Sequence, residues 1–276
     1  MQIDFVKMHG LGNDFIVFDA PKGAALPDRD TFRRLARRNT GIGFDQALVL
    51  EPPRRPDSSV YYRIFNADGD EVEQCGNGAR CIAALIARRR HAGPSDLLME
   101  SPGGLVRART REDGLVSVDM GVPNFDPRSL PSEASSESYV YPLTAAGSEI
   151  EIGAVSIGNP HAVIRVSSVD AAPVDRLGPA VENHPRFPRR TNVEFMEVVS
   201  PNHIRLRVHE RGTGETLACG TGACGAVAVG RRHGLLKEEV QVEVRGGRLI
   251  VNWPGDGEHI WLTGPTETAF EGRFEL

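Results

Sequence analysis

Cys75-Gly76-Asn77-Gly78-Ala79-Arg80-Cys81 is a glycine-rich cysteine motif that recurs 144 residues later as Cys219-Gly220-Thr221-Gly222-Ala223-Cys224-Gly225. Each copy opens an alanine-rich segment that is apolar on nearly all sides, which predicts buried helices over residues 76–90 and 220–233. Other landmarks recur at nearly the same spacing, namely Gly12-Asn13 with Gly158-Asn159, Gln46 with Asn192, Arg63 with Arg207, and Gly103-Gly104 with Gly246-Gly247. A matched series of this length predicts two copies of one half rather than a coincidence among common glycines.

The composition suits two globular domains. The chain has 276 residues, of which 40% are hydrophobic and 25% charged, enough for two ordinary cores. A third helix is expected over residues 30–38, capped by Asp30 or Thr31. Short runs rich in Val, Ile and aromatic residues predict strands at residues 15–18, 105–109, 162–166 and 240–244. The sequence therefore predicts a strand-rich α/β (α+β) protein in which each half wraps a sheet around its own central helix.

One segment is typical of a linker. Residues 123–138 contain three prolines and five serines, a composition that disfavours regular structure. We expect an N-terminal domain over residues 1–122 and a C-terminal domain over residues 123–263. A second crossing near Gly264-Pro265 would return residues 264–276 to the first domain.

Charge and hydropathy exclude several functional classes. The net charge of -5 comes from 37 acidic and 32 basic residues mixed along the chain, so there is no basic footprint for nucleic acid. The first ten residues form no apolar signal region and no stretch is long enough to cross a membrane, so we expect a cytoplasmic protein without a membrane partner. In a reducing cytosol four cysteines do not make a disulfide framework, and their spacings lack the C-x2-C signature of zinc sites. We therefore expect no metal.

The two motif cysteines stand where a helix begins. The first N–H groups of a helix are unsatisfied and its macrodipole is positive there, so this position favours an anion. For Cys75 and Cys219 that field is expected to stabilise the thiolate and lower the thiol pKa. A free cysteine is more often a small buried hydrophobe, and we assign that role to Cys81 and Cys224, which lie inside the helices.

A pair of thiols suits one kind of reaction. Inverting a carbon that bears hydrogen requires removing a proton from one face and delivering a proton to the other, which two acid/base groups do better than one. The glycines beside each cysteine also let a substrate carboxylate approach the helix N–H groups. The duplicated cysteines therefore predict a two-sided active site.

Longer stretches of the sequence resemble one known family. His9-Gly10-Leu11-Gly12-Asn13-Asp14-Phe15, Asn66-Ala67-Asp68-Gly69, the Cys75 motif, Gly158-Asn159-Pro160-His161, and Glu210-Arg211-Gly212 through Ala223 are similar to diaminopimelate epimerase, and the resemblance covers the whole chain. It implies two pseudo-symmetric domains, each a curved, mostly antiparallel sheet or barrel around a central helix, with the site between them. It also implies a cofactor-independent epimerase that interconverts LL- and meso-2,6-diaminopimelate by a two-base thiol/thiolate mechanism, in the synthesis of lysine and peptidoglycan precursors. A homodimer is implied by the resemblance alone.

The resemblance assigns roles by matching position. Cys75 and Cys219 become the two acid/base residues, and His161 and Glu210 tune the thiols. The residues implied to bind substrate are Asn13, Gln46, Asn66, Gly76, Asn77, Asn159, Asn192, Glu210, Arg211, Gly220 and Thr221. In this set Arg211 can pair with a carboxylate and Glu210 with an ammonium of the non-reacting end.

Two other readings stay open. The nearer one is another enzyme of the same duplicated fold, such as a proline racemase or a phenazine-pathway isomerase. The two retained thiols disfavour the isomerases, and Glu210-Arg211 disfavours a substrate without a charged distal end. The farther one is a nucleotide-binding module, because residues 220–225 formally read G-x-G-x-x-G. That motif is weak here, since no apolar strand directly precedes it.

Overall fold

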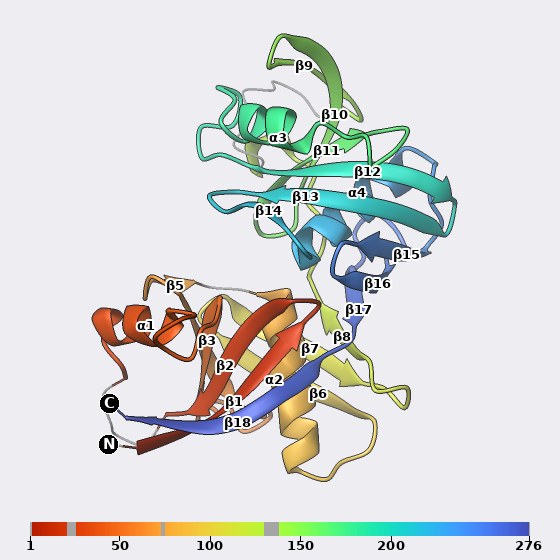
Figure 1. Cartoon of the computed structure of the whole chain (residues 1–276). Coiled ribbons are helices and arrows are strands. Elements are labelled where there is room, and N and C mark those ends of the chain that lie inside the picture. Colours follow the sequence, from red (N-terminus) through yellow and green to blue (C-terminus); the bar gives the residue numbers. More distant parts are fainter. Residues whose placement is uncertain (1, 21–25, 73–74, 130–137, 276) are drawn as a thin grey trace. The chain divides into compact units, whose positions relative to one another are not determined.

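The computed structural model of the protein describes residues 2–20, 26–72, 75–129 and 138–275 (Figure 1). The chain divides into two compact units. Unit 1 contains Met1–Val118 and Gly264–Leu276, and unit 2 contains Asp119–Thr263. Unit 1 is therefore built from two separate parts of the chain, whereas unit 2 is continuous.

The elements of unit 1 are β1 (Gln2–Gly10), β2 (Asn13–Asp19), α1 (Arg29–Ala36), β3 (Gln46–Glu51), β4 (Tyr61–Asn66), β5 (Glu71–Val72), α2 (Gly76–Arg89), β6 (Ser95–Ser101), β7 (Gly104–Thr110), β8 (Val116–Asp119) and β18 (Glu267–Glu275). β1 pairs antiparallel with both β2 and β18. β2–β3 and β4–β6 are the parallel pairs, and β3–β4, β4–β5, β6–β7 and β7–β8 are antiparallel.

The elements of unit 2 are η1 (Pro127–Ser129), β9 (Tyr141–Ala145), β10 (Ser148–Ser156), β11 (Pro160–Arg165), α3 (Val174–Glu182), β12 (Asn192–Ser200), β13 (His203–Glu210), β14 (Gly214–Thr216), α4 (Gly220–Arg232), β15 (Glu239–Val244), β16 (Gly247–Asn252) and β17 (Trp261–Gly264). β11–β12 and β13–β15 are parallel pairs, and the pairs β9–β10, β10–β11, β12–β13, β13–β14, β15–β16 and β16–β17 are antiparallel.

The two units repeat one topology. From β1 and from β10 onward, the same series of antiparallel and parallel pairings follows, with a helix after the second strand and another after the fifth. An ion pair repeats as well, because Arg63 binds Glu71 and Arg207 binds Glu215, each with Nε 2.7 Å from the carboxylate. The predicted fold class, with two pseudo-symmetric and mostly antiparallel halves, is confirmed.

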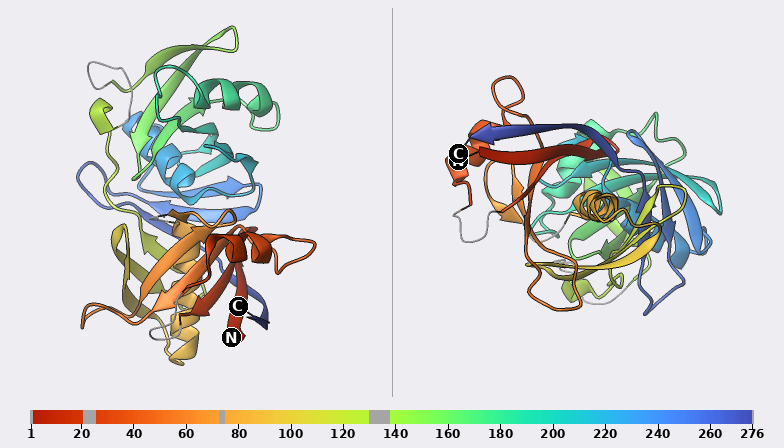
Figure 2. Two further views of the ribbon diagram at one scale, coloured as in Figure 1. Left: turned by 90° about the vertical axis from the view of Figure 1, so that its left-hand side faces the viewer. Right: turned by 90° about the horizontal axis from the view of Figure 1, so that it is seen from below.

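Each unit holds one largely buried helix. α2 packs against β1, β2 and β7, and α4 packs against β10, β11, β12 and β16. Figure 2 shows α2 end-on with strands of its unit on more than one side. All residues from Asn77 to Ala83 of α2 and from Gly222 to Gly230 of α4 are buried, as the largely apolar sequence of both segments predicts, and in α2 these include the polar Asn77 and Arg80. Both observed helices end one residue before their predicted ends.

The remaining helices depart from the prediction. The cap of α1 is Asp28, whose Oδ1 accepts the Thr31 N–H at 2.8 Å, and neither Asp30 nor Thr31 holds that position. α3 was not predicted, because Gly178 and Pro179 lie within it and both residues usually interrupt helices. The predicted linker over residues 123–138 includes η1, while its part over residues 130–137 lies outside the described residues. Within the described ranges, no helix has both the length and the apolar character needed to cross a membrane.

Candidate active site

Cys75 and Cys219 occupy equivalent positions, each as the residue that caps the start of its helix. Both have extended backbone conformations that lead into α2 and α4. The Gly78 N–H donates to Cys75 Sγ at 3.4 Å, a contact that favours negative charge on the sulfur. Cys75 is half-buried and Cys219 is buried.

In unit 1 an asparagine and a carboxylate organise the surroundings of Cys75. The Cys75 thiol lies 3.8 Å from Asn13 Oδ1, and Asn77 Nδ2 donates to the same oxygen at 3.2 Å. Asn13 Nδ2 in turn donates to Asp45 Oδ2 at 2.9 Å. Asp45 therefore turns the Asn13 amide so that its oxygen faces the cysteine.

A network of charges fixes this arrangement. Arg38 binds Asp14 through two hydrogen bonds of 2.8 and 2.9 Å and binds Asp45 at 2.7 Å, and Lys7 Nζ lies 2.6 Å from Asp14. Burial raises the pKa of the Asp14 carboxyl, but Arg38 and Lys7 outweigh burial, so the pKa lies well below its usual range. The start of β2, which carries Asn13, is thus held by a network of ion pairs.

Gln46 and Asn66 lie opposite each other where β3 begins and β4 ends. Their backbones are register partners, and Gln46 Nε2 donates to Asn66 Oδ1 at 2.9 Å. Gln46 Oε1 is buried without a hydrogen-bond partner among the described residues. The structure therefore brings these two predicted residues together as one amide pair.

In unit 2 a chain of side chains leads away from Cys219. Its sulfur is 3.5 Å from Thr221 Oγ1, and Asn159 Nδ2 donates to that hydroxyl at 3.4 Å. Asn159 Oδ1 is 2.9 Å from His161 Nε2. His161 Nδ1 is 2.7 Å from Glu194 Oε1, and both of these side chains are fully buried.

The electrostatics at Cys219 differ from the sequence prediction. Burial raises the pKa of the Cys219 thiol well above its usual range, and the charges of Glu210 and Glu194 act in the same direction. The hydrogen bond with Thr221 and the Gly222 N–H lower the pKa, but their effect is smaller. The predicted lowering of the Cys219 pKa is therefore wrong, because burial and the two carboxyls raise it.

The loop after β13 carries the predicted Glu210 and Arg211. Asn192 Oδ1 accepts the Arg211 N–H at 3.0 Å, while Asn192 Nδ2 donates to the Pro160 carbonyl at 3.0 Å. Thr216 Oγ1 donates to Glu210 Oε1 at 2.5 Å. The Arg211 side chain is exposed and donates to the Arg189 carbonyl at 3.2 Å. Asn192 therefore holds the backbone of this loop.

A buried glutamate supports the same loop from α3. Glu182 Oε1 accepts the Gly212 N–H at 2.8 Å, and Glu182 Oε2 is 2.8 Å from His209 Nε2. Burial raises the pKa of the Glu182 carboxyl, but His209, the Gly212 N–H and Arg190 outweigh it, so the pKa is lowered. The carboxylate thus fixes both ends of the turn that presents Glu210 and Arg211.

The structure adds residues that the sequence prediction missed. Asp45 and Glu194 each hold a predicted residue in place, and Glu182 holds the turn beside Glu210 and Arg211; none of the three belongs to a quoted motif. A signal existed for Glu194, since it lies between Val193 and Phe195 in a strand of buried residues, where an unpaired acid is costly. Asp45 and Glu182 carry no comparable signal.

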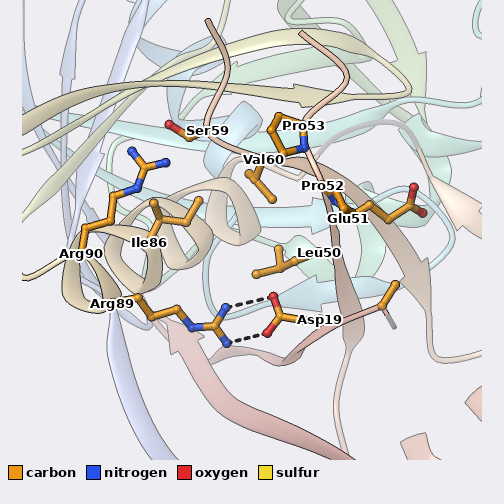
Figure 3. Close-up of a pocket in the computed structure, with 11 residues that line it drawn as sticks. Asp19, Leu50, Glu51, Pro52, Pro53, Ser59, Val60, Ile86, Arg89 and Arg90 are labelled. Atoms are coloured by element: carbon orange, nitrogen blue, oxygen red, sulfur yellow. Dashed lines mark hydrogen bonds and ion pairs between the residues drawn. The ribbon is translucent and has the colours of Figure 1, made fainter. Parts of the chain in front are cut away.

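A separate depression of about 350 Å³ lies on unit 1 and is lined by residues that include Leu50, Ile86 and Arg90 (Figure 3). Arg89 and Asp19 form an ion pair of 2.9 Å at its border. None of the predicted site residues lines it. In the part of the chain that the structure describes, no group of three or more His, Cys, Asp or Glu side chains has the geometry to hold a metal ion.

Comparisons with known proteins agree with these features. The family model described as diaminopimelate epimerase matches residues 5–125 and 153–269. A diaminopimelate epimerase from Alkalilimnicola ehrlichii is 52% identical over 278 residues and one from Pseudomonas aeruginosa is 49% identical over 276 residues, each covering 100% of both chains.

Solved structures show the same fold in more distant proteins. A probable proline racemase from Agrobacterium radiobacter has a TM-score of 0.72 at 17% identity, covering 99% of this chain and 93% of its own. A phenazine biosynthesis protein from Bacillus anthracis has a TM-score of 0.73 at 18% identity, covering 100% of both chains. The fold is thus shared widely, whereas the full-length identity of about half the residues is found with the epimerases. This chain therefore belongs to the diaminopimelate epimerase family.

Proposed function

We propose that this protein interconverts LL- and meso-2,6-diaminopimelate, without a cofactor, with Cys75 and Cys219 as its two acid/base groups. The observation that carries the proposal is that both cysteines cap equivalent helices and that each contacts polar side chains of its own unit. The full-length identity to diaminopimelate epimerases supports the same substrate and a place in lysine and peptidoglycan precursor synthesis.

The reaction needs only proton transfers. One cysteine, as a thiolate, takes the α-proton and becomes a thiol, while the other thiol gives its proton to the opposite face of the carbon and becomes a thiolate. The reverse reaction exchanges these roles, so no net proton is gained or lost. The N–H groups at the starts of α2 and α4, beside Gly76-Asn77 and Gly220-Thr221, would hold the carboxylate and stabilise the negative charge that develops on it.

The two cysteines have different surroundings. Cys75 is half-buried; it accepts the Gly78 N–H, which favours its thiolate, and its S–H donates to Asn13 Oδ1, which favours its thiol. The pKa of the Cys219 thiol is raised by burial and by Glu210 and Glu194, which favours its protonated form.

Specificity is assigned to the loop after β13. Glu210 would pair with the distal ammonium and Arg211 with the distal carboxylate. The amides of Asn13, Gln46, Asn66, Asn159 and Asn192 supply further donors and acceptors, and His161 acts through Asn159. Such remote contacts can provide the binding energy needed to attack a weakly acidic α-C–H group.

The test is proton NMR in D2O with LL-diaminopimelate or proline as substrate. We expect wild-type enzyme to replace the α-proton of diaminopimelate with deuterium and to form the meso isomer. Cys75→Ala and Cys219→Ala should each lower epimerisation by about 100-fold or more, because each removes an acid/base group. Cys81→Ala and Cys224→Ala are the controls, since they remove buried cysteines from the same helices without touching the helix starts.

Three outcomes would contradict the proposal. Exchange with proline but not with diaminopimelate would indicate a racemase, and exchange with neither would exclude both activities. Full activity of Cys75→Ala or Cys219→Ala would exclude the two-thiol mechanism.

A cytoplasmic location and a homodimeric state remain predictions of this proposal. Four free cysteines suit a reducing compartment. Light scattering of the purified protein measures the number of subunits, and fractionation of the producing cells measures the location.

A further inference from the structure

Glu194 lies at the far end of the series of hydrogen-bonded side chains that starts at Cys219. It is fully buried on β12, where its Oε1 is 2.7 Å from His161 Nδ1 and its Oε2 has no hydrogen-bond partner among the described residues. Burying an ionised carboxylate with so few hydrogen bonds is costly, whereas a neutral carboxyl avoids most of that cost. Burial raises the pKa of Glu194, and although His161 opposes this, the direction remains upward.

A protonated Glu194 gives every link of the chain one donor and one acceptor. Its hydroxyl donates to His161 Nδ1, so the ring proton sits on Nε2 and donates to Asn159 Oδ1. Asn159 Nδ2 then donates to Thr221 Oγ1, as the heavy-atom positions indicate. The Thr221 hydroxyl is left to donate to Cys219 Sγ, which stabilises the thiolate.

An ionised Glu194 reverses the chain. The carboxylate accepts from His161 Nδ1–H, so Nε2 becomes an acceptor. The Asn159 amide must then turn to donate to Nε2 and to accept the Thr221 hydroxyl. Thr221 Oγ1 now accepts from the Cys219 S–H, which stabilises the thiol. The two states contain the same number of protons and one negative charge, placed at opposite ends.

We propose that Glu194 is a positioning residue for Cys219. The protonation state of Glu194 sets the direction of this hydrogen-bond chain, so that Glu194 and Cys219 as a pair carry one negative charge, which lies on one residue or the other. The inference rests on the proposed acid/base role of Cys219. The titratable groups that face the pair are His161 on β11 and Glu210 at the end of β13. When Glu194 is ionised, its negative charge disfavours the Cys219 thiolate. The reversed hydrogen-bond chain disfavours the thiolate as well.

In unit 1 the corresponding hydrogen-bond chain has only one direction. There the asparagine that faces the cysteine is Asn13, and it donates to Asp45, which is ion-paired with Arg38. No histidine stands between the amide and this carboxylate, so the amide of Asn13 has one orientation. The reversible chain is thus a feature of unit 2.

The first experiment compares wild type with Glu194→Gln. The glutamine side chain is neutral and its amide completes the chain in either direction, so Cys219 no longer competes with a carboxyl for the single charge. The rate of Cys219 alkylation by iodoacetamide is followed against pH by peptide mass spectrometry, with Cys75 in the same sample as an internal reference. We expect the Cys219 midpoint to fall by about one pH unit, which is about a 10-fold faster reaction on the rising limb.

Glu197→Gln is the matched control. Glu197 lies on the same strand and binds the Val169 N–H and Arg205, away from the chain, so its replacement should leave the Cys219 midpoint unchanged. An unchanged midpoint in Glu194→Gln, or an equal shift in Glu197→Gln, would overturn the inference. Because alkylation requires no turnover, this result is independent of whether diaminopimelate is epimerised.

A second measurement uses wild-type protein and does not depend on the folding of a variant. Nitrogen-15 NMR reports which ring nitrogen of His161 is protonated, with the signal assigned by its loss in His161→Gln. We expect the proton to lie on Nε2 where Glu194 and Cys219 are both protonated, and to move to Nδ1 as the pH rises and Glu194 ionises. A tautomer that stays the same over the range in which Glu194 titrates would show that the chain does not reverse.

Discussion

Gly222 stands between the two ends of the charge pair in unit 2. A β-carbon at this position would lie 2.8 Å from Glu194 Oε1 and 3.4 Å from Cys219 Sγ. The first distance is shorter than a carbon and an oxygen tolerate, so the Glu194 carboxyl would have to move, and Cys219, whose Cβ would lie 3.3 Å away, would be crowded as well. The glycine therefore allows the helix start, the sulfur and the buried acid to lie close together.

Gly222→Ala should lower kcat by about 10- to 100-fold, because a displacement of a reacting group by about 1 Å has effects of this size. The measurement is steady-state epimerisation of diaminopimelate by the purified variant. Ala226→Gly is the control, since it weakens the same helix by about 1 kcal/mol at a position further along the chain from the cysteine, and it should keep kcat. Equal loss of kcat in both variants would mean that helix stability, and not placement of the thiol, is responsible.

At the scale of elements, α3 is the support of the loop after β13. Gly178 of this helix faces His209 of β13, and a β-carbon on Gly178 would lie 2.6 Å from His209 Cγ. This close approach allows Glu182 to reach both His209 and the Gly212 N–H. The helix therefore positions the turn that carries Glu210 and Arg211.

Gly178→Ala should push α3 away from β13, lower the free energy of unfolding by about 1 to 3 kcal/mol, and raise KM for diaminopimelate more than it lowers kcat. Urea unfolding and steady-state kinetics measure the two effects. Gly93→Ala is the control, since a β-carbon there would have no neighbour within 4 Å. A variant that is destabilised but keeps the wild-type KM would show that α3 does not contribute to substrate binding.

At the scale of the whole molecule, several acids are buried so well that alkaline pH should weaken the fold. Burial raises the pKa of Cys81 to about 12 from an ordinary 9.0, and it raises the pKa values of Cys219 and Tyr62 as well. At pH values below the pKa values of the unfolded chain, these groups are protonated in both the folded and the unfolded state, and their ionisation does not change the stability. As pH rises from those values toward the folded ones, the unfolded chain loses protons first, so the stability falls.

For Cys81 alone the loss amounts to up to about 4 kcal/mol between pH 9 and pH 12, at 1.36 kcal/mol for each unit. Cys81→Ala removes this titration. The variant should be less stable than wild type at neutral pH, and the gap between their melting temperatures should narrow as the pH rises over this interval. A gap of constant width would show that Cys81 does not ionise on unfolding.

The duplicated motif was enough to predict much of this architecture. The cysteines, the glycines beside them and the two buried helices follow from local sequence, because a helix that is apolar all round can only be buried. α3 did not follow, since its glycine and proline are compensated by tertiary contacts such as that of Gly178 with His209. The placement of Asp45, Glu182 and Glu194 depends on which strands and helices lie side by side, and that information is not local.

The pairing of β18 with β1 has a consequence for the order of events during synthesis. The strand that completes the sheet beside the first residues of the chain is Glu267–Glu275, so the ribosome must make all of unit 2 before unit 1 can close. Domains usually fold in the order in which they emerge, yet here the continuous second unit has all of its strands available first. Until β18 has been synthesised, β1 has an exposed edge that can pair with strands of other chains. Slow translation of the last codons would prolong that exposure.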